Sequence, residues 1–192
     1  MVPNGWERIK LKDIGNCLNG LTYSPKDVVE NGLLVLRSSN IQNSNLSFLD
    51  NVYVNIEVPE ESRTRFGDII LCVRNGSKSL IGKSAFIGKS SEGLTHGAFM
   101  SSFRSNDTPE YTFQLFQSPL FFKQVNQNLG ATINSINNGN LYNFNFPYPP
   151  IEERKKIATI LGTWDNAIST TERLIDNSKQ QKKALMQQLL TG

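Results

Sequence analysis

The pattern of hydrophobic and polar residues divides the chain at Pro147-Tyr-Pro-Pro150. Before this point, short apolar runs alternate with Gly, Asn and Ser, which is typical of strands separated by turns. These runs predict strands over 33–37, 67–73 and 84–87. Helical spacing of apolar residues predicts a helix over 109–127, and Pro119 should break it into two short helices. We therefore expect a mixed α+β (α/β) domain over residues 1–148.

After Pro150 the pattern is that of one long helix over 149–192. Glu152 and Glu153 place negative charge on its first turn, where the helix dipole favours it, and Gly192 suits its C-terminal end. Ten residues recur at alternating spacings of four and three, which is a heptad seam. The seam consists of Ile157, Leu161, Trp164, Ile168, Thr171, Ile175, Ser178, Lys182, Leu185 and Leu189.

A helix of this length spans roughly 60 Å and cannot bury its whole seam on a domain of this size. The seam therefore predicts a second helix beside it, although a long core helix is the alternative. The expected pairing residues are the apolar ones, Ile157, Leu161, Trp164, Ile168, Ile175, Leu185 and Leu189.

Composition places the chain among ordinary globular proteins. It has 192 residues, 38% of them hydrophobic, and a net charge of +3. No apolar run approaches the roughly 18 residues of a membrane span, and the N-terminal residues do not resemble a secretory signal. Cys17 and Cys72 are too few for a disulfide scaffold and indicate thiols in a reducing environment. We expect a cytoplasmic protein that does not contact membranes.

The sequence offers little that could carry out a reaction. His96 is the single histidine, which argues against a zinc site or a His-based triad. The glycines form no phosphate-binding loop, and no Gly-x-Ser-x-Gly elbow occurs. Glu153-Arg-Lys155 has the spacing of a nuclease half-motif, but the first turn of the long helix explains its acid. We expect no catalytic residue, no metal and no bound cofactor.

Polar and basic residues suggest a binding role instead. The chain has 21 Asn and 18 Ser, which suit turns and also the recognition of base edges. Residues 63–89 contain six basic side chains against Asp68 alone, in a stretch that includes the turn-forming Asn75-Gly76. Basic loops of this kind contact phosphates, although a solvated charged face is equally compatible with the pattern.

Several blocks then occur in one order along the chain. They are Gly5-Trp6 with Lys10-Leu-Lys-Asp-Ile14, Leu34-Val-Leu-Arg-Ser-Ser-Asn-Ile41, Phe66-Gly-Asp-Ile-Ile-Leu71, Gly130-Ala-Thr-Ile-Asn-Ser-Ile136, Phe146-Pro-Tyr-Pro-Pro-Ile-Glu-Glu-Arg-Lys-Lys-Ile157 and Lys182-Lys-Ala-Leu-Met-Gln-Gln-Leu-Leu-Thr-Gly192. In this order they resemble the specificity subunits of type I restriction–modification systems. The resemblance spans nearly the whole chain.

The resemblance implies a target recognition domain followed by a long helix that pairs as an antiparallel coiled coil. Specificity subunits have two such units, and each domain reads one half of a bipartite double-stranded DNA target. Their helices hold two modification (methyltransferase) subunits, which bind S-adenosylmethionine and methylate adenine, and restriction subunits can join the complex. The resemblance thus implies a non-catalytic subunit that binds no cofactor itself.

This chain departs from that pattern because it holds one unit and is a half-length form. It either pairs with another specificity half or with a copy of itself. We favour the homodimer, whose two-fold symmetry predicts an inverted repeat in the target.

Candidate DNA-binding residues are polar side chains that end strands or lie in basic and Asn-rich loops. They are Arg37, Ser38, Asn40, Arg74, Asn75, Ser77, Lys78, Lys83, Thr132, Asn134, Ser135 and Asn137. Lysines suit phosphates, whereas Arg and Asn suit bidentate base contacts. Turn capping is the alternative, above all for Asn137. Two rival functions stay open, a protein-interaction adaptor and an inactive half-subunit, whereas a self-sufficient nuclease or methyltransferase lacks its signature.

Overall fold

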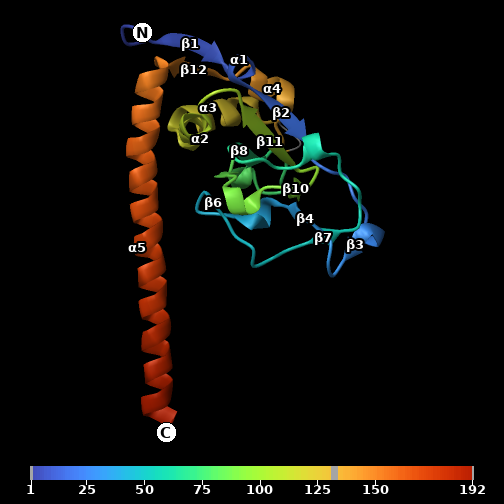
Figure 1. The fold of residues 1–192 in the computed structure, drawn as a ribbon, viewed down its shortest axis with the longest axis vertical. Helices are drawn as coiled ribbons and strands as arrows, with labels where there is room; N and C mark the ends of the chain where they lie inside the picture. The colour runs from blue at the N-terminus through green and yellow to red at the C-terminus, as the bar shows by residue number, and fades with distance from the viewer. Residues whose placement is uncertain (1, 131–133, 192) are drawn as a thin grey trace.

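The computed structural model describes residues 2–130 and 134–191 and confirms a mixed α+β domain followed by a long C-terminal helix (Figure 1). The strands are β1 (Glu7–Lys10), β2 (Gly15–Asn19), β3 (Val28–Val29), β4 (Leu33–Leu36), β5 (Ile41–Gln42), β6 (Asn45–Leu46), β7 (Tyr53–Val54), β8 (Asp68–Cys72), β9 (Ser84–Phe86), β10 (Thr95–His96), β11 (Met100–Ser105) and β12 (Asn145–Tyr148). The α-helices are α1 (Leu11–Ile14), α2 (Pro109–Gln117), α3 (Pro119–Asn128), α4 (Asn138–Tyr142) and α5 (Ile151–Thr191). Short 3₁₀ turns cover Pro25–Asp27, Ser38–Asn40, Glu60–Ser62, Lys78–Leu80 and Lys89–Ser91.

The core lies on an antiparallel sheet with the strand order β2-β11-β8-β9. Every residue of β8 is buried, which explains why its sequence is almost continuously apolar. Helix α2 packs on β8, β9 and β11 and also contacts α5, so it lies between the sheet and the long helix. Aromatic rings fill the space between these layers, with Phe116 5.4 Å from Phe103 and 4.7 Å from Phe121, measured between ring centroids.

A second sheet, with the order β10-β4-β7-β3, carries the segments that surround the candidate site. Strand β10 runs parallel to β4, and its neighbour Gly97 forms a bridge with Leu21. Gly20 lies where these backbones cross, and a Cβ there would collide with the carbonyl of Gly97. The segment after β2 therefore stays next to the turn between β10 and β11.

The predicted strands correspond to β4, β8 and β9, and the predicted break at Pro119 separates α2 from α3. Ser118 caps the second helix, because its Oγ accepts a hydrogen bond from the Phe121 N–H at 3.2 Å. The pairing of β1 with β12 was not predicted. It places Glu7 opposite Tyr148 and ties the N-terminal strand to the segment that leads into α5.

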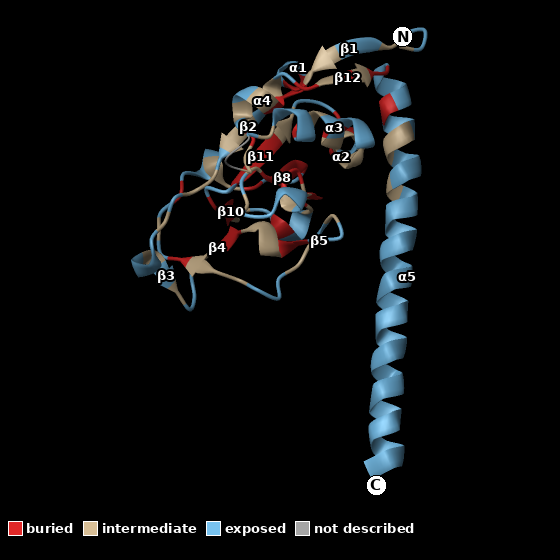
Figure 2. Ribbon diagram, turned by 180° about the vertical axis from the view of Figure 1, so that it is seen from behind, coloured by how far each residue is buried: buried red, intermediate tan, exposed pale blue. Residues whose placement is uncertain are grey.

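Helix α5 extends 41 residues and leaves the domain behind after its first turns (Figure 2). Among its described residues only Arg154 is buried, while Ile157 and Ala158 pack against the edge of the domain core. The predicted helix end at Gly192 lies outside the described residues. No helix in the described part of the chain combines the length and apolarity needed to cross a membrane.

Buried His96 predicts a pH dependence of folding stability. Burial lowers the pKa of His96 below its ordinary value of 6.5, outweighing the opposing hydrogen bond with the Leu18 carbonyl. As the pH falls below about 6.5, the unfolded chain binds the proton first, so the free energy of unfolding should decrease. His96→Gln removes this titration. Urea unfolding at about pH 7.5 and about pH 5 should show a smaller decrease for H96Q than for the wild type, and equal decreases would contradict the assignment.

Candidate nucleic-acid interface

Three segments that are distant in sequence meet at the loop that follows β8. Asn75 donates a hydrogen bond from Nδ2 to Ser38 Oγ at 3.1 Å, and its Oδ1 accepts one from the Ser77 N–H at 3.0 Å. The backbone N–H of Asn75 donates to the Asn134 carbonyl, and Asn134 Nδ2 donates to the Gly76 carbonyl at 2.9 Å. We call this loop, 73–80, together with 37–39, 83, 97–99 and 134–135, the recognition surface.

Besides Arg37, the recognition surface carries three positive charges. Arg74 and Lys78 are exposed, and half-buried Lys83 donates to the Ser38 carbonyl at 3.4 Å. In the described part of the chain, no carboxylate forms an ion pair with any of these three residues. Their charges are therefore free to neutralise an anionic partner.

An aromatic residue that the sequence analysis missed stands beside Arg74. Phe99 is 59% exposed, and its carbonyl accepts hydrogen bonds from the N–H groups of Val73 and Arg74. The Arg74 guanidinium lies 5.7 Å from the centroid of the Phe99 ring. The backbone contacts thus hold the two side chains side by side. Phe99 is apolar, so charge and hydrogen-bonding chemistry could not point to it; its available signal was an aromatic residue in the turn that begins at Gly97-Ala98.

Two hollows flank this pair. One, of about 820 Å³, is bordered by Tyr23, Arg37 and Phe99, and the other, of about 590 Å³, by Asn19 and Arg74. Ala98 and Met100 border both hollows, so the turn that carries Phe99 is their common border.

Most of the predicted DNA-binding residues come together on this surface. They are Ser38, Arg74, Asn75, Ser77, Lys78, Lys83, Asn134 and Ser135, the last through a backbone bridge to Arg74. Arg37 borders the larger hollow, but its charge is compensated because Nη2 pairs with Asp50 at 2.9 Å. Thr132 lies outside the described residues.

Two of the predicted asparagines have structural roles within the domain. The prediction for Asn40 is wrong: the residue is fully buried, and its Nδ2 donates to the carbonyls of Ser47 and Asp50 at 3.0 and 3.1 Å. A buried amide that closes its own loop cannot reach a base. Asn137 is exposed, but it forms a capping box with Asn140 at the start of α4, which is the turn role considered as the alternative.

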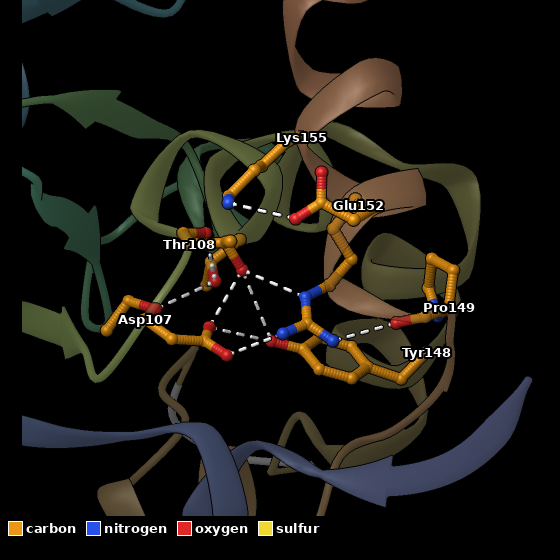
Figure 3. A network of polar contacts seen from close by, with 9 residues as sticks. Asp107, Thr108, Tyr148, Pro149, Glu152 and Lys155 are labelled. Carbon is orange, nitrogen blue, oxygen red and sulfur yellow. Dashed lines mark hydrogen bonds and ion pairs between the residues drawn. The ribbon is translucent and has the colours of Figure 1, made fainter.

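The junction between the domain and α5 is a second site that sequence analysis missed (Figure 3). Arg154 donates to Asp107 Oδ2 at 2.6 Å, to Thr108 Oγ1 at 3.1 Å and to the Pro149 carbonyl at 2.7 Å. Its guanidinium also lies 4.1 Å from the centroid of the Tyr148 ring. In the sequence this residue looks like one more charge on a helical first turn; its position four residues after Pro150 was the only local signal.

The neighbours of the Asp107 carboxylate in this network change its pKa. Partial burial raises the pKa of Asp107, but hydrogen bonds from Thr108 and Tyr148 and the positive charge of Arg154 outweigh this and lower it. Arg154 and Asp107 thus form a charged pair at the point where α5 leaves the domain.

Beyond the junction, α5 presents an apolar stripe to solvent. Leu161, Ile168, Ile175 and Leu185 are exposed, Trp164 is 66% exposed and Leu189 is 81% exposed. Ile157 packs partly against the domain core and marks where the stripe leaves the domain, and its role in helix pairing stays a prediction. Within residues 2–130 and 134–191, His, Cys, Asp and Glu side chains form no group of three that could hold a metal ion.

The chain is 32% identical over 99% of its length to a specificity subunit described as that of the putative type I restriction enzyme MjaX of Methanocaldococcus jannaschii, of which it covers 46%. It spans about half the length of the curated relatives that it matches.

Two solved structures share the fold at 18% identity. One belongs to a study of complex assembly and conformational transition of the type I R-M system, with a TM-score of 0.68 over the whole chain and 46% of that protein. The other is the HsdS subunit from Thermoanaerobacter tengcongensis, with a TM-score of 0.64 over 97% of this chain and 49% of that one.

The family model described as the type I restriction modification DNA specificity domain matches residues 3–178, which include both the recognition surface and most of α5. The chain therefore belongs to the type I restriction modification DNA specificity domain family.

Proposed function

We propose that this chain reads one half of a bipartite double-stranded DNA target as the non-catalytic specificity subunit of a cytoplasmic type I restriction–modification complex. The observation that carries the proposal is that Arg74, Lys78 and Lys83 meet on one surface beside exposed Phe99 and form no ion pair within residues 2–130 and 134–191. Lysines at such a surface neutralise phosphates in any sequence, whereas a guanidinium can form two hydrogen bonds to guanine. An apolar ring beside it suits the methyl group of thymine.

Helix α5 supplies the second half of the proposal. Its solvent-exposed apolar stripe pairs with the helix of a second copy, and the helix pair docks modification subunits that bind S-adenosylmethionine. Two copies related by a two-fold axis read a symmetric target, and a restriction subunit can complete the endonuclease. That the chain covers 46% of a relative's length supports an arrangement of two units.

The proposal predicts separate effects for two cations of the loop, Arg74 and Lys78. In DNA-binding measurements on the complex with a modification subunit, Arg74→Ala should reduce discrimination between target and non-target DNA by about 1–3 kcal/mol. Lys78→Ala should weaken binding to all sequences alike and reduce the slope of log K against log salt by about one. Lys89→Ala is the matched control. Lys89 is exposed but follows the C-terminal end of β9, whereas the loop lies before the N-terminal end of that strand.

Adenine methylation mapping by single-molecule sequencing tests the whole proposal in cells. A palindromic bipartite motif that requires both this chain and the modification subunit is the expected result, and R74A should relax it. An asymmetric motif would replace the second copy with a different specificity half. DNA affinity that does not change with salt would favour a protein-interaction adaptor, and a stable complex without methylation would favour an inactive half-subunit.

A further inference from the structure

We infer that two copies of α5 pair antiparallel in one particular register, in which each polar seam residue faces an apolar one. The inference rests on the proposed function in one respect, namely that the chain works as two copies. It adds which residues meet, where the two-fold axis crosses the helix and which pair sets the orientation.

The register follows from the order of residues along the seam. Because α5 is one uninterrupted helix, its alternating spacings of four and three read the same from either end. In a heptad seam the residues alternate between two positions, called a and d. Antiparallel pairing places each residue at position a of one helix opposite a residue at position d of the other. Counting outward from the centre, the layers join Thr171 to Ile175, Ile168 to Ser178, Trp164 to Lys182, Leu161 to Leu185 and Ile157 to Leu189.

The polar residues distinguish this arrangement from a parallel one. A parallel pair in register would place Lys182 against Lys182, Thr171 against Thr171 and Ser178 against Ser178. The first of these contacts brings two like charges together within the seam, which is unfavourable. In the antiparallel register Lys182 instead lies over Trp164 of the partner subunit, which is the best aromatic acceptor for a cation. Each polar residue then has an apolar neighbour that can cover its methylene or methyl groups.

The charges that flank the seam support the same direction. Over residues 160–176 the helix has Asp165, Glu172 and Asp176 against Arg173 alone, whereas residues 177–191 hold Lys179, Lys182 and Lys183 and no acid. Antiparallel pairing places the basic half of one helix along the acidic half of the other. It brings Lys179 of the partner subunit to the side of Asp165.

Two further residues lie close to the axis. Leu174 is off the seam yet 59% exposed, and the register brings it next to its own copy, which gives this apolar side chain a partner. On the opposite flank the two Glu172 carboxylates approach each other, and their repulsion should weaken the pair slightly. The register therefore predicts one favourable contact at the axis, between the two Leu174 side chains, and one unfavourable contact, between the two Glu172 carboxylates.

Cysteine cross-linking tests the register directly. The double variant Thr171→Cys, Ile175→Cys should form a covalent dimer under mild oxidation, because its two cysteines face each other across the seam. Each single variant should stay uncrosslinked, since antiparallel pairing separates identical positions by more than the roughly 7 Å that a disulfide spans. The native cysteines give a low background, because burial raises the pKa of both thiols, that of Cys17 to about 12; the wild-type chain under the same oxidant measures it.

Sedimentation equilibrium provides a second test, because the register predicts whether each variant weakens or tightens the dimer. Lys182→Ala should weaken dimerisation about tenfold through loss of two cation–π contacts, and should have no effect when Trp164 is already Ala. Lys183→Ala is the matched control on the outer face of the helix, and Glu172→Gln should tighten the dimer.

Cross-linking of the T171C single variant, or a tighter dimer for K182A, would overturn the register. A chain that stays monomeric would overturn it as well, while methylation mapping with the modification subunit would still decide the DNA-reading role on its own.

Discussion

Replacing Arg104 with Met is expected to destabilise the domain by about 3–5 kcal/mol, the largest effect of any single substitution proposed for this chain. Arg104 Nε and Nη2 donate to the two carboxylate oxygens of Asp68, both at 2.8 Å. Asp68 is 1% exposed, so removing the guanidinium leaves a buried carboxylate with only the Arg65 N–H as an additional donor. The two residues face each other across β8 and β11, the two central strands of the main sheet.

Denaturant unfolding of the variant measures this loss. A second variant separates the buried charge from the missing packing: Asp68→Asn combined with Arg104→Met removes the charge and should be more stable than Arg104→Met alone. A loss below about 1 kcal/mol for the single variant would mean that the carboxylate finds water or another donor. The pair also explains the aspartate in the block Phe66-Gly-Asp68, which serves the fold rather than DNA.

Replacing Arg154 with Met should cost about 2–4 kcal/mol, somewhat less than Arg104→Met. The guanidinium is buried, but its partner Asp107 keeps 39% of its side chain exposed and can be rehydrated when the arginine is lost. Thr108 and the Pro149 carbonyl also lose their donor. The expected cost therefore lies between those of a fully buried and a surface ion pair.

The neighbouring residue provides the control. Lys155 pairs with Glu152 at 3.1 Å on the same helical turns, but both side chains are mostly exposed, so Lys155→Ala should change the free energy of unfolding by less than about 1 kcal/mol. Methylation by the assembled complex is the functional measurement. Since Arg154 joins the first turn of α5 to Asp107 and Thr108 of the domain, Arg154→Met should reduce methylation even at temperatures where the domain stays folded. Normal methylation in a folded variant would show that the helix needs no such anchor.

Much of the architecture could be predicted because its signals are local. The long helix follows from the absence of Pro over 151–190, the separation of α2 and α3 from Pro119, and the buried strand β8 from its apolar run. The pairing of β1 with β12 joins segments from opposite ends of the domain and leaves no periodic trace in either. Tertiary contacts alone determine it.

The residues of the candidate site also fall into those that local signals could predict and those that they could not. Charge and turn chemistry identified the loop at Arg74 and Lys78, because solvent exposure of basic side chains is the ordinary outcome. The same reasoning failed for Asn40 and Arg154, which are polar by type but buried by context. Phe99 was missed for the opposite reason, since an apolar residue is expected inside and this one is outside.

The antiparallel ribbon of β1 and β12 has a consequence for how such chains can be built. Because β12 leads directly into α5, the start of the chain lies beside the start of the helix, and Trp6 donates a hydrogen bond to Glu153 at 3.1 Å. In the inferred register, Leu189 of the partner subunit reaches Ile157, only one helical turn further along. The last turn of one copy and the first strand of the other are then neighbours, and a short linker would join them into a single polypeptide without changing either fold. Tandem duplication and fusion of such a unit gives a chain of about twice this length, which is the length of the relatives that it matches.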